Sequence, residues 1–178
     1  MGCVEGFAVW LTGIPASGKS TIAKVLAERL AKRGVKVQVL ESDEVRRVLM
    51  PRQGYTEEER DSFYRALTYV GELLVKNGVN VVLDATANKR KYREEARKRI
   101  AKFVEVYVKC PLEVAMRRDP KGLYRRALKG EITELPGLQR AYEEPLSPEV
   151  VVESDRESPE EAAAKIEAKL LELGYLEA

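Results

Sequence analysis

The chain has 178 residues, 44% of them hydrophobic, which is enough for a single core, so we expect residues 1–178 to form one domain. Its 31 basic and 29 acidic residues leave a net charge of +2, so no global field marks a membrane or nucleic-acid binder. It contains no histidine, which excludes a histidine base and most zinc sites, and no apolar run of about 18 residues that could cross a membrane.

Two further features of the composition concern the cellular setting. Cys3 and Cys110 lack a metal-ligand spacing, so we interpret both as ordinary thiols in a reducing compartment. No signal-peptide pattern precedes the first strand, and we expect a cytoplasmic protein. The 34% charged fraction, with only six asparagines and glutamines together, indicates a heat-adapted source.

The first elements of the chain flank a phosphate-loop pattern. A short apolar strand is expected at 7–12 and a helix at 19–32, which Gly34 would end. Between them the sequence fits G-x-x-x-x-G-K-[ST]. The residues of this loop are Gly13, Ile14, Pro15, Ala16, Ser17, Gly18, Lys19, Ser20 and Thr21.

The chemistry of a triphosphate explains these residue types. Backbone N–H groups at a helix N-terminus bind anions, and Gly13 and Gly18 let the chain approach the phosphate oxygens. Lys19 would reach the β and γ phosphates of ATP, and the Ser20 hydroxyl would ligate Mg²⁺. A glycine turn that happens to precede a helix is the alternative. It does not explain why strand, loop, lysine, hydroxyl and helix are all in register.

The remaining elements alternate between strand and helix, which predicts an α/β fold of the P-loop kinase type, with a central parallel sheet flanked by helices. A capping box of Thr56 with Glu59 opens the longest helix, and Ser158 with Glu161 opens the last one, which ends at Gly174. In chain order we expect a strand at 35–40, a helix at 44–50, a helix from 56 to about 76, a strand at 79–83, a basic helix at 88–101, a strand at 103–109, a helix at 112–118 and a strand at 150–152.

The segment from 119 to 148, which we call the lid segment, differs in composition. It holds four prolines and three glycines among many charges, so we expect a mobile polar flap and not a core element. Its string Asp119-Pro120-Lys121-Gly122-Leu123-Tyr124 belongs to a basic stretch that could neutralise a transferring phosphoryl group. A solvated helix would explain the charges equally well, but not this string.

Carboxylates follow two of the expected strands. Ligands of open parallel sheets bind at the carboxyl ends of the strands, where Glu41-Ser42-Asp43 and Asp84-Ala85-Thr86 lie in this sequence. Asp43 could hold the metal or orient an attacking hydroxyl, and we favour this role over a helix N-cap. For Asp84, function and capping are equally open.

Three arginines and one tyrosine are further candidates. Arg46 lies three residues after Asp43, on the same helix face, where a guanidinium suits phosphate or sulfate. Arg60, one turn into the long helix, is a second anion-binding candidate, whereas Arg47 fits a solvated surface arginine. Tyr55 could offer its ring to a base or pack in the core.

The lid string resembles the lid signature of the adenylylsulfate kinase family, a family of P-loop enzymes. Other stretches also match this family, and the likeness runs from the phosphate loop to about residue 145. These stretches are Pro111-Leu112-Glu113-Val114, Ala127, Gly130-Glu131-Ile132, Tyr142-Glu143 with Pro145, and Gly54-Tyr55-Thr56.

The resemblance implies that the chain transfers the γ-phosphoryl group of ATP, with Mg²⁺, to the 3′-hydroxyl of adenosine 5′-phosphosulfate, a small-molecule substrate of sulfate assimilation. It implies catalytic roles for Lys19, Asp43 and Arg46, with Asp43 and Ser20 near the metal. The family often forms homodimers, and that state stays open. The residues implied to contact the substrates are Asp43, Arg46, Tyr55, Arg60, Lys121 and Leu123.

Several positions depart from the family pattern and keep other functions open. Its Asp-Gly-Asp is here Glu41-Ser42-Asp43, a common asparagine is Phe63, a serine linked to a phosphorylated intermediate is Ala87, and Asp-Asp-Pro is Gln139-Arg140-Ala141. The string from Asp84 to Asn88 looks more like kinases of polynucleotide ends or of RNA-linked serine, in which the basic helix would follow a nucleic-acid backbone. A nucleotide-binding protein without turnover is the third hypothesis.

Overall fold

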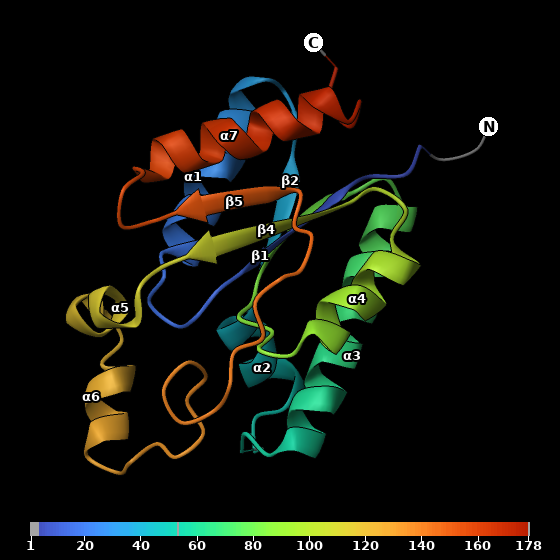
Figure 1. The fold of residues 1–178 in the computed structure, drawn as a ribbon. Helices are drawn as coiled ribbons and strands as arrows, with labels where there is room; N and C mark the ends of the chain where they lie inside the picture. The colour runs from blue at the N-terminus through green and yellow to red at the C-terminus, as the bar shows by residue number, and fades with distance from the viewer. Residues whose placement is uncertain (1–3, 53, 178) are drawn as a thin grey trace.

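The computed structural model describes residues 4–52 and 54–177, and it confirms the predicted α/β fold. Five parallel strands form one sheet in the order β2-β3-β1-β4-β5 (Figure 1). Cys110 is a half-buried free thiol, whereas Cys3 lies outside the described residues and its interpretation stays a prediction. The strands are β1 Ala8–Thr12, β2 Val37–Glu41, β3 Asn80–Asp84, β4 Phe103–Lys109 and β5 Val150–Glu153.

Helices cover both faces of the sheet and surround the carboxyl ends of its strands. Helices α1 and α7 lie on one face, and α3 and α4 lie on the other (Figure 1). The capping boxes predicted for α3 and α7 are both present. The helices are α1 Lys19–Lys32, α2 Ser42–Leu49, α3 Glu57–Lys76, α4 Arg90–Arg99, α5 Leu112–Arg118, α6 Leu123–Leu128 and α7 Pro159–Glu172.

Strand β1 lies in the middle of the sheet and is buried along its whole length. Because side chains alternate between the faces of a strand, Val9 and Leu11 pack into the cluster under α1 and α7. Ala8 and Trp10 pack into the cluster under α3 and α4. The core therefore fixes β1 from both sides, and with it the start of the loop that follows at Gly13.

The topology places a crevice at the end of β1. The chain leaves β1 through α1 toward β2 on one side, while β4 pairs with β1 on the other side. Such a reversal of direction opens a ligand crevice at the carboxyl ends of the strands. Since Leu11 pairs with Asp84 across β1 and β3, the ends of these two strands lie side by side.

The lid segment differs from the expectation of a polar flap outside the core. Residues 123–128 form α6, and the segment packs with α5 and the phosphate loop in a separate hydrophobic cluster. The sequence concealed this cluster because the apolar residues of the segment are interspersed with charges, prolines and glycines. Its buried members are Ala115, Tyr124, Ala127 and Leu135.

Element boundaries shift by a few residues for local reasons. Helix α2 begins at Ser42, earlier than expected, because the side chain of Glu41 caps it. Helix α4 begins at Arg90, later than expected, after Ala87 adopts a positive φ of 45° that a right-handed helix excludes. No helix within the described ranges combines the length and the apolar content that a membrane crossing requires.

Candidate active site

The phosphate loop connects β1 to α1 and contains two glycines, one closely packed and one with a positive φ. A Cβ atom on Gly13 would lie 2.4 Å from the carbonyl oxygen of Val108, so only glycine fits against β4 there. Gly18 forms the N-cap of α1 with a φ of 101°, a conformation that glycine adopts without strain. The amides of the first turn of α1 are thereby presented to the crevice.

Lys19 is buried at the base of this loop. Its Nζ atom donates to the carbonyl oxygens of Gly13 and Ile14, each at 3.0 Å. Burial lowers the pKa of Lys19 to about 8, although the carboxylates of Asp84 and Asp43 act to raise it. An additional anion near Nζ would favour the charged form, which is the response expected of a phosphate-binding lysine.

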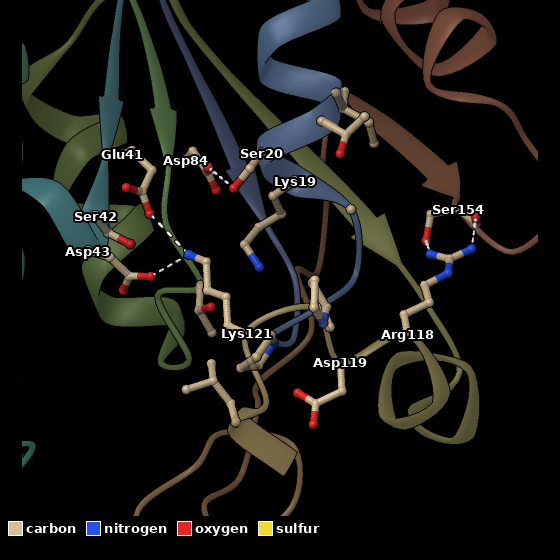
Figure 2. Close-up of a pocket in the computed structure, with 18 of the residues that line it drawn as sticks. Lys19, Ser20, Glu41, Ser42, Asp43, Asp84, Arg118, Asp119, Lys121 and Ser154 are labelled. Carbon is tan, nitrogen blue, oxygen red and sulfur yellow. Dashed lines mark hydrogen bonds and ion pairs between the residues drawn. The ribbon is translucent and has the colours of Figure 1, made fainter. Parts of the chain in front are cut away.

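Ser20 and Asp84 meet beside Lys19 (Figure 2). The Ser20 hydroxyl donates to Oδ2 of Asp84 at 2.6 Å, and this carboxylate is buried at the end of β3. Asp84 caps no helix, because α4 begins only at Arg90 and Lys89 is its N-cap. The capping alternative for Asp84 is therefore wrong, and its pairing with Ser20 was not visible in the sequence.

The oxygen donors of this pair fit Mg²⁺. Hydroxyl and carboxylate oxygens are its preferred ligands, and it is commonly bound through one or two protein groups together with substrate phosphates. Within the described residues no cluster of three or more histidine, cysteine, aspartate or glutamate side chains forms a self-sufficient metal site. A metal at Ser20 and Asp84 would thus depend on phosphate oxygens for its remaining ligands.

Asp43 lies across the crevice, in the first turn of α2. The capping role that was its alternative belongs to Glu41, whose side chain accepts from the amide of Glu44 at 3.3 Å. Lys121 of the lid segment reaches over to Asp43, with Nζ 2.6 Å from Oδ2, and lies 3.4 Å from Oε1 of Glu41 (Figure 2). Partial burial opposes the charge of Lys121, but its bonds to Asp43 and Glu41 raise its pKa.

A group of cations and rings adjoins Asp43. The Arg46 guanidinium lies 3.8 Å from the ring centroid of Phe63 and 4.8 Å from that of Tyr55. Only 8% of Arg46 is exposed, and its Nη1 atom is buried without a hydrogen-bond partner. Arg60 is held by the carbonyl oxygens of Tyr55, at 3.0 Å, and Glu134, at 2.5 Å. The guanidinium group of Arg46 therefore lies between aromatic rings beside the cavity, with its Nη1 atom covered by protein atoms.

Two adjoining cavities contain most of the predicted site residues. The first, of about 440 Å³, is lined by Pro15, Ala16, Gly18, Lys19, Ser20 and Thr21 of the loop and by Asp43, Asp84 and Lys121. The second, of about 590 Å³, is lined by Arg46, Tyr55 and Arg60. The residues common to both are Pro15, Ser42, Asp43, Thr86 and Leu123.

Three predicted loop residues do not line the first cavity. Gly13 and Ser17 support the backbone turn, and the side chain of Ile14 packs with the cluster of the lid segment. A Cβ atom on Gly137 would lie 2.8 Å from Cγ2 of Ile14, so the lid segment touches the phosphate loop closely.

Two residues of the lid string, Asp119 and Tyr124, have structural roles that were not predicted from its basic composition. The Asp119 carboxylate accepts from the amides of Tyr124, at 3.1 Å, and Arg125, at 3.0 Å, and so satisfies two first-turn amides of α6, whose N-cap is Gly122. The Tyr124 hydroxyl donates to the carbonyl oxygen of Pro15 at 2.7 Å. A negative charge near a helix N-terminus is stabilised by the helix dipole, and that signal could have predicted the first role.

A comparison with known proteins decides the family. The family model for adenylylsulphate kinase matches residues 5–153. The chain belongs to the adenylylsulphate kinase family. A probable adenylyl-sulfate kinase of Pyrococcus abyssi is 46% identical over 173 residues, covering 97% of this chain and 99% of the relative. An adenylyl-sulfate kinase of Picosynechococcus sp. is 46% identical over 172 residues, covering 97% of each protein.

The fold of this chain is also close to that of a solved member of the family. The APS kinase of Mycobacterium tuberculosis, whose structure was solved in complex with AMPPNP and APS, superposes with a TM-score of 0.89 at 35% identity. The match covers 94% of this chain and 98% of that one.

The departures from the usual adenylylsulfate kinase pattern have local explanations. The Glu41 side chain accepts from the amide of Glu44 in α2 and lies beside Lys121, so the longer side chain still faces the crevice. Phe63 lies under Arg46. Ala87 is fully buried and carries no hydroxyl that could be phosphorylated, and its amide donates to Tyr64. Gln139 bonds within the lid segment, to Leu135 and Ile132.

Proposed function

We infer that this protein transfers the γ-phosphoryl group of ATP to the 3′-hydroxyl of adenosine 5′-phosphosulfate, giving 3′-phosphoadenosine 5′-phosphosulfate. One observation carries the inference: a cavity bordered by the phosphate loop and a cavity bordered by arginines and a tyrosine ring meet at Asp43. Two nucleotides bound in them would have their reacting ends at this junction. The family of the chain and its likeness to a kinase solved with AMPPNP and APS support the same reaction.

The first cavity is suited to ATP. The loop amides and Lys19 would bind the β and γ phosphates, as the buried position of Nζ favours. Ser20 with Asp84, and Asp43 through water, are the groups that would hold Mg²⁺. When bound, Mg²⁺ neutralises charge on the phosphates. Lys121 adds a lid cation next to the transferring group.

The second cavity is suited to an anionic nucleotide. Arg46 lines this cavity, and its guanidinium group would bind a sulfate or phosphate oxygen by a charge-assisted hydrogen bond. Arg60 would contribute a second positive charge, and Tyr55, with 49% of its surface exposed, a face for the adenine. Asp43 would accept or orient the proton of the attacking hydroxyl.

The ion pairs of α4 argue against the alternative in which this basic helix binds a nucleic-acid backbone. Four of its basic side chains are paired with carboxylates, as is Lys89 just before it, so they do not form a free stripe for a phosphate backbone. Buried Arg93 cannot reach solvent at all. The pairs are Lys89 with Glu57, Lys91 with Asp61, Arg93 with Glu105, Arg97 with Glu149, and Arg99 with Glu72 and Glu95.

Steady-state kinetics test the proposal. The wild-type protein is expected to phosphorylate adenosine 5′-phosphosulfate and not a 5′-hydroxyl oligonucleotide. Asp43→Ala and Arg46→Ala should each reduce turnover by roughly two orders of magnitude or more, because a proton acceptor or an oriented charge is lost. Arg65→Ala, an exposed arginine of α3, is the matched control and should leave the rate unchanged. Turnover of the oligonucleotide alone, or ATP binding without transfer, would contradict the proposal.

We also propose that the product serves sulfate assimilation in the cytoplasm. Heat adaptation, suggested by the charged composition, stays a prediction that a thermal unfolding curve tests. Formation of a homodimer stays a prediction, and light scattering of the purified protein would establish the oligomeric state.

A further inference from the structure

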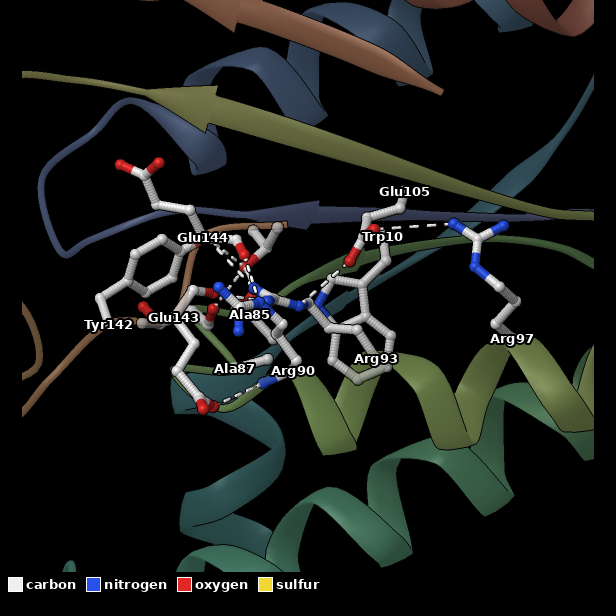
Figure 3. A network of polar contacts seen from close by, with 12 residues as sticks. Trp10, Ala85, Ala87, Arg90, Arg93, Arg97, Glu105, Tyr142, Glu143 and Glu144 are labelled. Atoms are coloured by element: carbon white, nitrogen blue, oxygen red, sulfur yellow. Dashed lines mark hydrogen bonds and ion pairs between the residues drawn. The ribbon is translucent and has the colours of Figure 1, made fainter. Parts of the chain in front are cut away.

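A buried cluster of polar side chains lies behind the phosphate loop, outside both cavities (Figure 3). At its centre is Arg93 of α4, which is only 1% exposed. Its Nη1 atom donates to the Thr12 hydroxyl at 2.9 Å and to the Tyr142 hydroxyl at 3.3 Å. Its Nη2 atom donates to the carbonyl oxygen of Glu143 at 2.6 Å. One side chain thus joins the end of β1 to the lid segment.

The positive charge of Arg93 is balanced by an ion pair with Glu105. The Arg93 Nε atom lies 3.1 Å from Oε2 of Glu105 on β4, although it is not aligned for a hydrogen bond. Arg97 lies 3.6 Å from the other oxygen of Glu105. Burial raises the pKa of Glu105, and the two arginines oppose this shift. Since an unpaired buried charge is costly, Arg93 is confined to this position.

The Thr12 hydroxyl determines the direction of the hydrogen bonds. It has one proton, which it donates to the carbonyl oxygen of Thr86 at 2.6 Å. It must therefore accept from Tyr142, whose hydroxyl lies 2.8 Å away. Burial raises the pKa of Tyr142 to about 12, so this tyrosine keeps its proton in the usual pH range. Tyr142 is the donor, and Thr12 directly precedes Gly13 of the phosphate loop.

The same stretch of the lid segment is held by backbone contacts. The amide of Glu143 donates to the carbonyl oxygen of Asn88 at 2.8 Å, and Nδ2 of Asn88 donates to the carbonyl oxygen of Ala141 at 3.1 Å. Residues 141–143 are thus fixed between α4 and β1. Residues 141–143 are one attachment of the lid segment, and the Tyr124 hydroxyl, which donates to Pro15 of the phosphate loop, is another.

We propose that Tyr142 is a positioning residue for phosphoryl transfer, which acts through Thr12 to hold the lid segment in a fixed position relative to the phosphate loop. The inference rests on the proposed kinase function for its catalytic consequence. Arg93 orients the pair from behind. Because phosphoryl transfer depends on the placement of charges around a loose transition state, a small displacement of the lid cations reduces the rate more than it reduces binding.

Tyr142→Phe tests the proposal by removing a single hydroxyl. We expect kcat to fall about tenfold, with KM for ATP and for adenosine 5′-phosphosulfate changed less than threefold. Tyr107→Phe is the matched control: its ring stacks on Tyr142 at 6.1 Å, but its hydroxyl bonds Glu144, so the variant removes a bond to the lid segment that does not pass through Thr12. It should keep the wild-type kcat. A fall of kcat in both variants, or in neither, would overturn the proposal.

A double-mutant cycle distinguishes coupling between Thr12 and Tyr142 from a general loss of stability. Thr12→Val removes the acceptor, so Thr12→Val combined with Tyr142→Phe should lose no more activity than the worse single variant. Additive losses would contradict a link through this bond. Trp10, the one tryptophan of the chain, donates to the carbonyl oxygen of Ala85 at 3.0 Å, and unchanged fluorescence would show that the sheet is intact.

Amide hydrogen exchange supplies a readout that needs no substrate turnover. Residues 120–140 should exchange faster in Tyr142→Phe than in the wild type or in Tyr107→Phe, with the sheet unaffected. If the wild-type protein failed to phosphorylate adenosine 5′-phosphosulfate, the proposed function would fail, while faster exchange would still support the attachment. Equal exchange in all three proteins would refute it.

Discussion

The buried position of Lys19 predicts how nucleotide affinity depends on pH. Its pKa is lowered to about 8 in the protein without nucleotide, chiefly by burial. A bound triphosphate favours the ammonium form and therefore raises this pKa. A group whose pKa is raised on binding contributes its full affinity below the pKa of the free protein. That contribution is lost as the pH rises from about 8 toward the pKa of the complex.

The size of the effect follows from the fraction of Lys19 that is charged. With a pKa of about 8, roughly nine tenths are protonated at pH 7 and roughly one tenth at pH 9. The dissociation constant of an ATP analogue should therefore rise about tenfold between these pH values, which corresponds to about 1.4 kcal/mol. Binding should also take up about half a proton at pH 8 and close to one at pH 9.

Isothermal titration calorimetry measures both quantities. A nonhydrolysable ATP analogue with Mg²⁺ is titrated between pH 7 and 9 in two buffers of different ionisation enthalpy, and the difference in heat gives the protons taken up. Lys19→Arg is the control, because arginine stays charged throughout and should bind with little pH dependence. Constant affinity and no proton uptake in the wild type would refute the assignment of Lys19 to the phosphates.

Two further substitutions test the acceptor pocket and the lid segment. Phe63→Leu removes the ring under Arg46, a contact worth about 0.5–2 kcal/mol, so KM for adenosine 5′-phosphosulfate should rise roughly 2- to 30-fold with KM for ATP unchanged. Phe103→Leu, on the same face of the sheet, should leave both values unchanged. Asp119→Ala removes the acceptor of two first-turn amides of α6 and should accelerate amide exchange there by about tenfold, corresponding to a loss of about 1–2 kcal/mol. Unchanged exchange would contradict this role of Asp119.

Local sequence signals predicted the helices and strands and the part of the site formed by the phosphate loop and Asp43. The phosphate loop and both capping boxes depend on residues within a few positions of one another, so their spacing is visible in the chain. The position of Asp43 after a strand placed it at the crevice. The same reasoning could not assign Asp84, because its partner Ser20 is 64 residues away and the two meet only through the register that pairs β1 with β3.

The acceptor pocket shows why composition alone was insufficient. Phe63 departs from the family pattern, yet its ring supports Arg46, a contact between α2 and α3 that no spacing rule gives. The lid segment was expected to be a polar flap because it holds four prolines and three glycines among many charges. Some of its apolar side chains, Tyr124 and Leu135 among them, are nevertheless buried together. Long-range packing, rather than average polarity, decides the outcome in both cases.

The hydrogen-bond partners of Lys19, Lys121 and Arg46 suggest which of these cations contribute to affinity and which to specificity. Lys19 and Lys121 already bond to protein oxygens, to loop carbonyls and to Asp43. A triphosphate must exchange these bonds for its own, so each exchange contributes only a difference between two similar interactions. Arg46 has a buried nitrogen with no bond to exchange. An anion bound by the Arg46 guanidinium in the second cavity displaces no protein oxygen, so this contact is expected to contribute more than either exchange. Discrimination among acceptors is consequently expected to depend on Arg46 more than on the phosphate loop.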